Sequence, residues 1–273
     1  MQRNALRILA AFVALLTPAA ARAIVLDWDG VAWTAGSLSN SYDIDPAKAG
    51  NDITVAVTAN GGATFQPEVV APNPMTPARS PSFQGGLATT ENTLCLALNL
   101  TSNTQSVTVT VSFSPLYTTG VFNVSFSLFD IDFVDGDGSA YQDQLSSIRA
   151  LSIDGITLIA PTITTSANNS LSGTGINQLV TGNASNSDIG AGSGNGNVTI
   201  SFGANAIRSF TFTYGSGPAF ADPTFQHVGI HDLSFTPVPE INPAWTAGIS
   251  CFAAAGLLWH RRNRFRRQLP SAG

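Results

Sequence analysis

Strict alternation of apolar and polar residues is the feature that most constrains how this chain folds. In the stretch 107–113 every second residue is Val or Phe and the residues between them are Thr or Ser, and the stretches 122–128 and 210–214 repeat this pattern. A period of two places one set of side chains on the buried face of a β-strand and the other set in water. Between residues 24 and 236 there is no helical period of useful length. The pattern therefore predicts an all-β body.

Shorter and weaker strand patterns fill much of the remaining body, with Gly, Asn and Pro between them. Many short strands separated by turn residues predict an antiparallel β-sandwich or jelly roll. Two stretches are expected to interrupt it: 66–86, which contains five prolines, as a long extended loop, and 164–197, rich in Ser, Thr, Asn and Gly, as a loosely ordered segment. The weaker strands are expected at 52–58, 94–100, 147–153, 156–160, 197–202 and 226–235.

Charge is sparse and unevenly distributed along the chain. Only 11% of the residues are charged, and the formal net charge is -5. All 17 Asp and Glu lie between Asp27 and Glu240, whereas most of the 12 Lys and Arg lie in the first 23 or the last 13 residues. An acidic body of this kind does not suit nucleic acid, so we expect no nucleic-acid partner.

The first 23 residues have the organisation of a secretory signal peptide. Arg3 and Arg7 precede an apolar run over 8–16, and Ala21 and Ala23 supply the small residues that signal peptidase requires. We therefore expect export through the inner membrane and cleavage after Ala23. The alternative is an uncleaved signal anchor, which the short apolar run disfavours.

The last segment, 237–273, is also directed to a membrane. A Pro-rich motif at 238–243 precedes an apolar run at 244–259, which is predicted to form a single transmembrane helix, and a basic tail at 260–267. Arginine stems can extend the reach of a short apolar run, and an arginine cluster remains on the cytoplasmic side. The alternative is a buried helix with a basic tail, but a soluble core has no use for such a cluster. The expected membrane stop consists of Arg261, Arg262, Arg264, Arg266 and Arg267.

This tripartite end resembles the PEP-CTERM protein-sorting domain of Gram-negative bacteria. The matching residues are Val238, Pro239 and Glu240, followed by the short apolar helix and the arginine cluster. The run that continues to Pro243 is similar to a form common in Verrucomicrobia-type proteins, with Ile241 where the usual Pro-Glu-Pro has its second proline. The resemblance implies recognition by an exosortase, a membrane cysteine transpeptidase, and cleavage near Pro239 and Glu240. The product would reach the cell surface or the extracellular polysaccharide.

Acidic residues are concentrated in the segment 128–143. Five of the 14 Asp lie between positions 130 and 143, directly after a strong strand. Carboxylates this close repel one another, so water or a hard cation must screen them, and calcium takes six to eight oxygen ligands. The spacing does not fit an EF-hand loop. Two interpretations remain open: a calcium site, or a solvated acidic loop that prevents sheet edges from pairing.

The acidic segment, together with residues 229–235, resembles parts of β-sandwich ectodomains of surface-sorted bacterial proteins and of some carbohydrate-binding jelly rolls. This resemblance implies that calcium is the cofactor and that its ligands are Asp130, Asp132, Asp143 and Asp232.

A few other side chains have two interpretations. His227 and His231 are four residues apart, but two ligands are too few for zinc, and we expect solvent-facing or hydrogen-bonded imidazoles. Trp28 and Trp33 are expected to pack in the core, with stacking on sugars as the alternative. Cys95 is expected to be a small buried residue in a strand, with intermolecular pairing of its thiol as the alternative.

Motifs of the common hydrolase, nucleotide-binding and metalloprotease families do not occur in the chain. The sequence therefore predicts a non-catalytic exported protein that an exosortase sorts to the cell surface or the extracellular matrix. The expected partners are the exosortase, the inner membrane in a transient way, and an exopolysaccharide. The alternative is a calcium-stabilised, carbohydrate-binding jelly-roll module. A secreted hydrolase would need a placed pair of carboxylates, which the sequence does not reveal.

Overall fold

The computed structural model of this chain describes residues 22–68, 72–88, 90–136, 139–183 and 193–238. In this part the chain forms β-strands and two short 3-10 turns, η1 (Gly175–Asn177) and η2 (Gly194–Gly196). None of the helices there is long and apolar enough to cross a membrane. The predicted sorting motif, apolar run and arginine cluster lie almost entirely outside the described residues, as does most of the predicted signal peptide.

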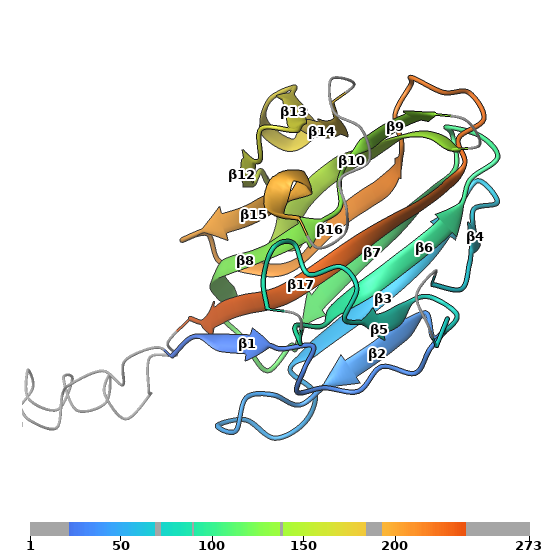
Figure 1. Cartoon of the computed structure of the whole chain (residues 1–273). Helices are drawn as coiled ribbons and strands as arrows, with labels where there is room; N and C mark the ends of the chain where they lie inside the picture. Colours follow the sequence, from blue (N-terminus) through green and yellow to red (C-terminus); the bar gives the residue numbers. More distant parts are fainter. Residues whose placement is uncertain (1–21, 69–71, 89, 137–138, 184–192, 239–273) are drawn as a thin grey trace, which may run out of the picture. The chain divides into compact units, whose positions relative to one another are not determined.

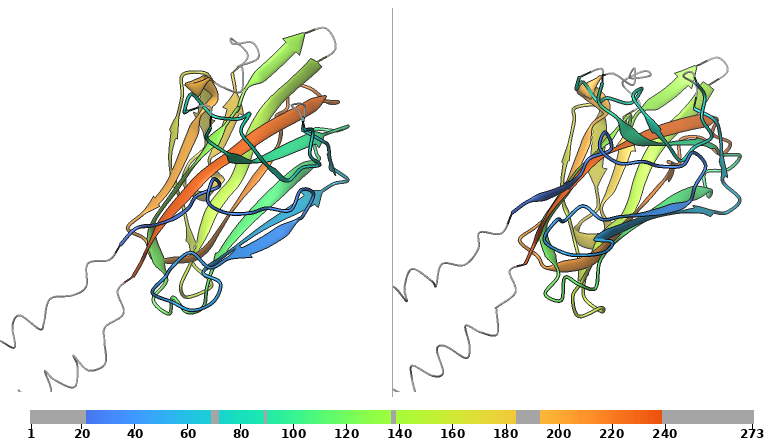
Figure 2. Two further views of the ribbon diagram at one scale, coloured as in Figure 1. Left: turned by 60° about the horizontal axis from the view of Figure 1, so that its bottom comes forward. Right: turned by 90° about the horizontal axis from the view of Figure 1, so that it is seen from below.

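The strands pair in two antiparallel layers (Figure 1; Figure 2). The layers are linked at one edge, where Ile207 pairs with Val121. The first layer begins with the order β12 (Thr162–Thr165), β15 (Val198–Gly203), β8 (Val121–Phe129) and β17 (Phe225–Pro237). Two strands, β1 (Ile24–Leu26) and β6 (Thr93–Asn99), then pair with different parts of β17. The strands β4 (Thr64–Phe65) and β5 (Ala78–Ser80) pair with β6.

The second layer is built around the two long strands β10 and β16. Its order is β2 (Ser39–Tyr42), β3 (Ile53–Asn60), β7 (Ser106–Phe113), β16 (Ile207–Ser216), β10 (Ser139–Ser152), β14 (Leu179–Gly182) and β13 (Asn169–Ser172), with β9 (Phe133–Gly136) and β11 (Leu158–Ile159) also paired to β10.

Aromatic side chains from the two layers meet in the core. Phe126 of β8 stacks on Phe210 and Phe212 of β16, with ring centroids 4.8 and 5.6 Å apart. Phe113 of β7 packs against Phe235 of β17 at 5.0 Å. Offset aromatic pairs of this kind add to the apolar area that the two faces remove from water. The core therefore lies between the layers, as in a β-sandwich.

The all-β, antiparallel prediction is confirmed, and the three strongly alternating stretches lie within β7, β8 and β16. The weaker patterns also coincide with strands, although 156–160 contains only the two residues of β11. The expectation of a loosely ordered segment at 164–197 is wrong in part, because β13 and β14 lie there. The reason is Val180, a fully buried residue that pairs with Leu145 of β10. Likewise, β5 lies inside the proline-rich stretch and pairs with β6.

Two further expectations concern buried side chains. Trp28 and Trp33 are 1% and 8% exposed and pack edge to face with centroids 6.2 Å apart, so the core interpretation is confirmed. Cys95 is fully buried in β6, as expected, and burial raises the pKa of its thiol well above its usual value.

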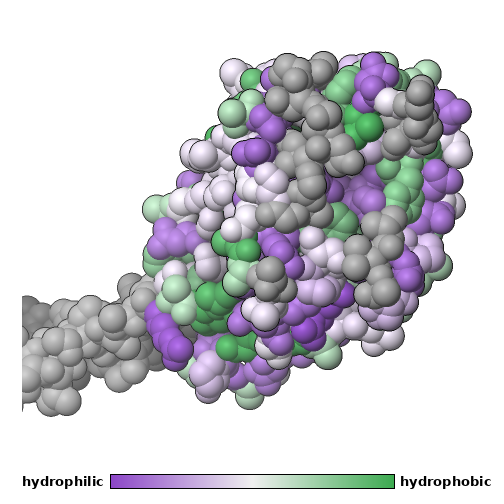
Figure 3. Space-filling view, in the orientation of Figure 1, coloured by the Kyte–Doolittle hydropathy of each residue, from purple (hydrophilic) through white to green (hydrophobic). Residues whose placement is uncertain are grey.

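On the face drawn in Figure 3, hydrophobic residues are scattered among hydrophilic ones where the atoms are coloured.

Candidate functional site

A β-bulge in β17 brings two polar side chains together on the outer face of the first layer. Ile230 and Leu233 pair with residues of β8 that are only two positions apart, so His231 and Asp232 share the space of one residue. In a regular strand, two consecutive side chains point to opposite faces. The extra residue lets Ile230 and Leu233 both enter the core and leaves His231 and Asp232 both partly exposed.

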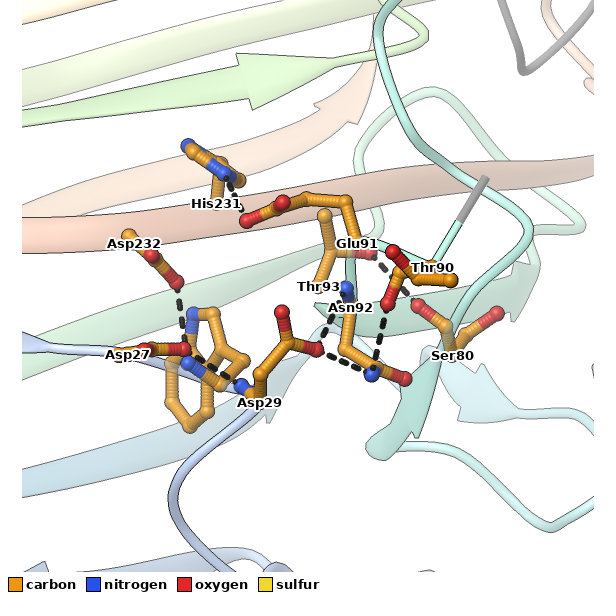
Figure 4. Close-up of polar contacts among 10 residues, drawn as sticks. Asp27, Asp29, Ser80, Thr90, Glu91, Asn92, Thr93, His231 and Asp232 are labelled. Atoms are coloured by element: carbon orange, nitrogen blue, oxygen red, sulfur yellow. Dashed lines mark hydrogen bonds and ion pairs between the residues drawn. The ribbon is translucent and has the colours of Figure 1, made fainter. Parts of the chain in front are cut away.

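The strands on the other side of β17 change at the same point. β6 pairs with β17 up to Ile230, and β1 pairs with it from Leu233. The segment that follows β1 and the segment that precedes β6 therefore meet beside the bulge. Figure 4 shows the side chains that they bring there, among them Asp27, Asp29 and Glu91. Three chain segments, the bulge of β17 and the two segments beside it, thus converge on one small polar area.

Three of these side chains form a group that could hold a metal ion. Glu91 Oε1 lies 3.0 Å from His231 Nε2, and Asp232 Oδ1 accepts a hydrogen bond from the Trp28 amide at 3.0 Å. Ligand atoms of Glu91, His231 and Asp232 all lie within 4.8 Å of one another. One imidazole and two carboxylates match the preferences of borderline divalent cations such as zinc.

The electrostatic environment of this group is acidic. Burial raises the pKa of the Asp232 carboxyl, and the charges of Asp27 and Glu91 raise it further, against the opposing effects of the Trp28 amide and His231. Asp29 is fixed beside the group, because its Oδ1 accepts a hydrogen bond from the Asn92 amide at 3.1 Å.

The structure divides the four residues predicted to bind calcium. Asp232 belongs to the group with Glu91 and His231. The other three, Asp130, Asp132 and Asp143, lie in a different part of the fold, where β8 leads into the β9–β10 hairpin. These three are 8%, 1% and 0% exposed, so the interpretation as a solvated loop is wrong for them. Calcium binding stays a prediction.

Two hydrogen bonds join Asp132 and Asp143, one between a backbone amide and the Asp143 carboxyl and one between backbone groups. The Asp132 amide donates to Asp143 Oδ2 at 3.1 Å, and the Asp143 amide donates to the Asp132 carbonyl oxygen at 2.9 Å. Burial raises the pKa of Asp143 well above its usual value, and the charges of Asp132 and Asp130 add to this shift.

The contacts of Tyr214 fit a protonated Asp143. The Tyr214 hydroxyl oxygen lies 2.7 Å from Asp143 Oδ1 and 2.6 Å from the His227 carbonyl oxygen. A hydroxyl has only one hydrogen to donate, and the carbonyl can only accept. If Tyr214 donates to the carbonyl of His227, the proton between Tyr214 and Asp143 must come from the carboxyl. With Tyr214 donating to the His227 carbonyl, burial and the neighbouring carboxylates favour a neutral Asp143 that donates to the Tyr214 hydroxyl; a Tyr214 hydroxyl that donates to Asp143 instead would lower the pKa of Asp143.

His227 does not join His231, although both lie on β17. Its ring packs against Phe83 and Phe225, with centroids 5.1 and 4.3 Å apart, and its Nε2 atom is buried without a hydrogen-bond partner in the described part of the chain. Burial lowers the pKa of His227 to about 4. The imidazole is therefore neutral at pH 7, and its proton uptake is coupled to unfolding.

Acid should destabilise the fold through His227. In the unfolded chain this imidazole takes up a proton near pH 6.5, whereas in the folded chain it does so near 4. Stability is therefore lost as the pH falls through this window, by roughly 1 kcal/mol per unit. We expect His227→Phe to abolish this loss, so that between pH 7 and 4.5 the wild type loses about 2 kcal/mol more than the variant in urea unfolding. Equal losses in both chains would contradict the assignment.

Comparisons with known proteins give distant structural similarities alone. The chain is similar to a family 11 carbohydrate-binding module of the cellulosomal cellulase Lic26A-Cel5E of Clostridium thermocellum, with 9% identity over 82% of this chain and 99% of that chain and a TM-score of 0.33. It is also similar to the N-terminal domain of the Streptococcus gordonii adhesin Sgo0707, with 10% identity over 80% of this chain and 57% of that chain and a TM-score of 0.32. No family model and no curated protein sequence matches the chain.

Proposed function

We propose that this chain is a non-catalytic exported protein whose β domain is delivered to the cell surface or to the extracellular polysaccharide matrix. The observation that carries the proposal is the position of the two ends of the domain. Ile24 in β1 pairs with Phe235 in β17, and the Val238 amide donates to the Gly120 carbonyl oxygen at 3.1 Å. The two ends of the described domain, which continue in sequence into the predicted signal peptide and the predicted sorting tail, therefore lie side by side (Figure 1).

The limits of the strand pairing support the same proposal. The first paired residue, Ile24, directly follows the predicted cleavage site, and β17 ends at Pro237, one residue before the predicted sorting motif. The described strand pairings and core therefore use no residue that the two cleavages would remove. A domain limited in this way can lose both segments and keep its hydrogen bonds.

The tail then serves as a temporary tether in this proposal. Its apolar run holds the exported domain at the inner membrane, its arginines remain in the cytoplasm, and its prolines keep the motif extended for the exosortase. Cleavage near Pro239 and Glu240 passes the domain to the surface or to an exopolysaccharide.

Carbohydrate binding by a calcium-stabilised jelly roll is the alternative function. Trp28 and Trp33 are buried, so these two tryptophans are not available to stack on sugars and do not support this alternative. A glycan array probed with the exported protein tests the alternative, and binding to no polysaccharide would end it.

Export is tested with alkaline phosphatase, which is active only outside the cytoplasm, fused after Val238. We expect high activity from the fusion and none from a matched fusion that lacks residues 2–23. Activity that stays equally low in both fusions would contradict export.

A further inference from the structure

Exposed apolar side chains gather at the end of the β domain where the chain enters and leaves. Strand pairings place Ser152, Ile207, Val121 and Pro237 in one row across both layers. The turn between β10 and β11 projects beyond this row. Its Ile156 is 83% exposed, more than any other large hydrophobic residue in the described part of the chain.

The β10–β11 turn lies against the exit point of the chain. A Cβ atom at Gly120 would be 2.5 Å from Ile153 Cγ2, so the Ile153 side chain packs directly on the Gly120 backbone. The carbonyl of the same glycine accepts the Val238 amide, and Thr119 Oγ1 donates to the Val238 carbonyl oxygen at 3.1 Å. Ile153 is therefore separated from the last described residue by one layer of backbone.

Two more apolar side chains and two cations complete this surface, which we name the exit-end surface. Leu116 and Leu158 are 46% and 42% exposed. Lys48 Nζ donates to the Leu116 carbonyl oxygen at 2.9 Å, and Arg208 Nη2 donates to the Ile153 carbonyl oxygen at 2.6 Å. The exit-end surface consists of Lys48, Leu116, Ile153, Ile156, Leu158 and Arg208.

The turn is held in a fixed shape that projects Ile156. Asp154 Oδ1 accepts the amides of Ile156 and Thr157 at 2.8 and 2.9 Å, and its Oδ2 accepts the Thr157 hydroxyl at 2.5 Å. The Asp154 carboxylate is therefore turned back into the loop.

We infer that the exit-end surface rests on the phospholipid bilayer while the tail is anchored, with Ile153 and Ile156 in the interfacial region. This inference rests on the proposed function. Five residues, 239–243, separate the domain from the apolar run. Fully extended, they reach roughly 20 Å, which keeps the exit end close to the lipid headgroups. A lipid interface of this kind accepts exposed apolar side chains that have Lys or Arg side chains beside them.

Lipid-attached quenchers test this contact in the full chain reconstituted into vesicles of phosphatidylethanolamine and phosphatidylglycerol. Cys251 is replaced by serine, buried Cys95 stays unlabelled, and an environment-sensitive fluorophore is attached in Ile156→Cys. The matched control is Asp222→Cys, an exposed position in the β16–β17 connection at the opposite end of the domain. Circular dichroism confirms that both variants are folded.

We expect a doxyl-labelled lipid to quench the fluorophore at position 156 about twofold or more beyond its effect at position 222. Strong quenching by aqueous iodide at both positions, in a chain that alkaline extraction leaves in the vesicles, would overturn the inference and leave the tether intact. Protection of position 156 from iodide without lipid quenching would indicate a second copy of the chain and would also overturn it. Loss of the chain on alkaline extraction would overturn the membrane tether itself, and the inference with it.

Discussion

Replacing Asp143 by asparagine should leave the β domain at least as stable as the wild type at pH 7, whereas replacing it by alanine should destabilise the domain strongly. The asparagine amide can donate to the Tyr214 hydroxyl, and its carbonyl can accept the Asp132 amide, as the protonated carboxyl does. Alanine leaves the buried Asp132 amide without this partner, removes one of the two partners of the Tyr214 hydroxyl and opens a cavity, so we expect a loss of about 3–5 kcal/mol in urea unfolding.

The wild type and Asp143→Asn should also differ in how their stability depends on pH. Because the pKa of Asp143 is raised in the folded state, the folded chain holds its proton while the unfolded chain releases it near its usual pKa of 3.8. The stability contributed by Asp143 is full below that value and is lost as the pH rises toward the folded pKa. Asp143→Asn lacks this loss. A variant less stable than the wild type at pH 7, with an unchanged pH profile, would contradict a neutral Asp143.

The same pair of chains tests the calcium prediction. A calcium site that includes Asp130, Asp132 and Asp143 would need an ionised Asp143, and asparagine would weaken it. Calorimetric titration with calcium, before and after chelation, would then show heat and a shift in melting temperature for the wild type and much less of both for Asp143→Asn. No heat in either chain would end the calcium hypothesis.

Replacing Glu240 by alanine should abolish processing of the tail. The proposal places cleavage beside this residue, so the variant should accumulate as a full-length, membrane-bound precursor while the wild type is converted to a shorter product. Immunoblots of membrane and extracellular fractions measure the two forms. Asp222→Ala, which removes one exposed carboxylate from the β domain, is the control and should be processed normally. Normal processing of Glu240→Ala would contradict recognition of the motif.

Elements with a strong period of two could be predicted from the sequence. In β7, Val107, Val109 and Val111 are buried, and Thr108 and Thr110 are not, so period and burial coincide. Short strands such as β1 and β13 carry too few residues to show a period. β1 forms because the long strand β17 offers free backbone groups at its position, and β13 pairs with β14, which in turn pairs with the long strand β10. Such pairing depends on contacts between distant segments, which a local pattern does not contain.

The candidate site could be predicted only in part, for the same reason. The density of aspartates pointed to the place where Asp130, Asp132 and Asp143 are buried, but not to Tyr214, the partner of Asp143, which is 71 residues away from it. Glu91 could not be placed beside His231, because 140 residues separate them and the bulge that turns Asp232 outward leaves no mark in the alternation. A regular strand would have directed Asp232 and His231 to opposite faces.

The termini of the protein recovered from the native cell envelope test the central claim most directly. Mass spectrometry should find a chain that begins at Ile24 and ends close to Pro239, with the apolar run and the arginines removed. A chain that extends from Met1 to Gly273 in that fraction would contradict both cleavages, and with them the account of this protein as an exported domain on a temporary tether.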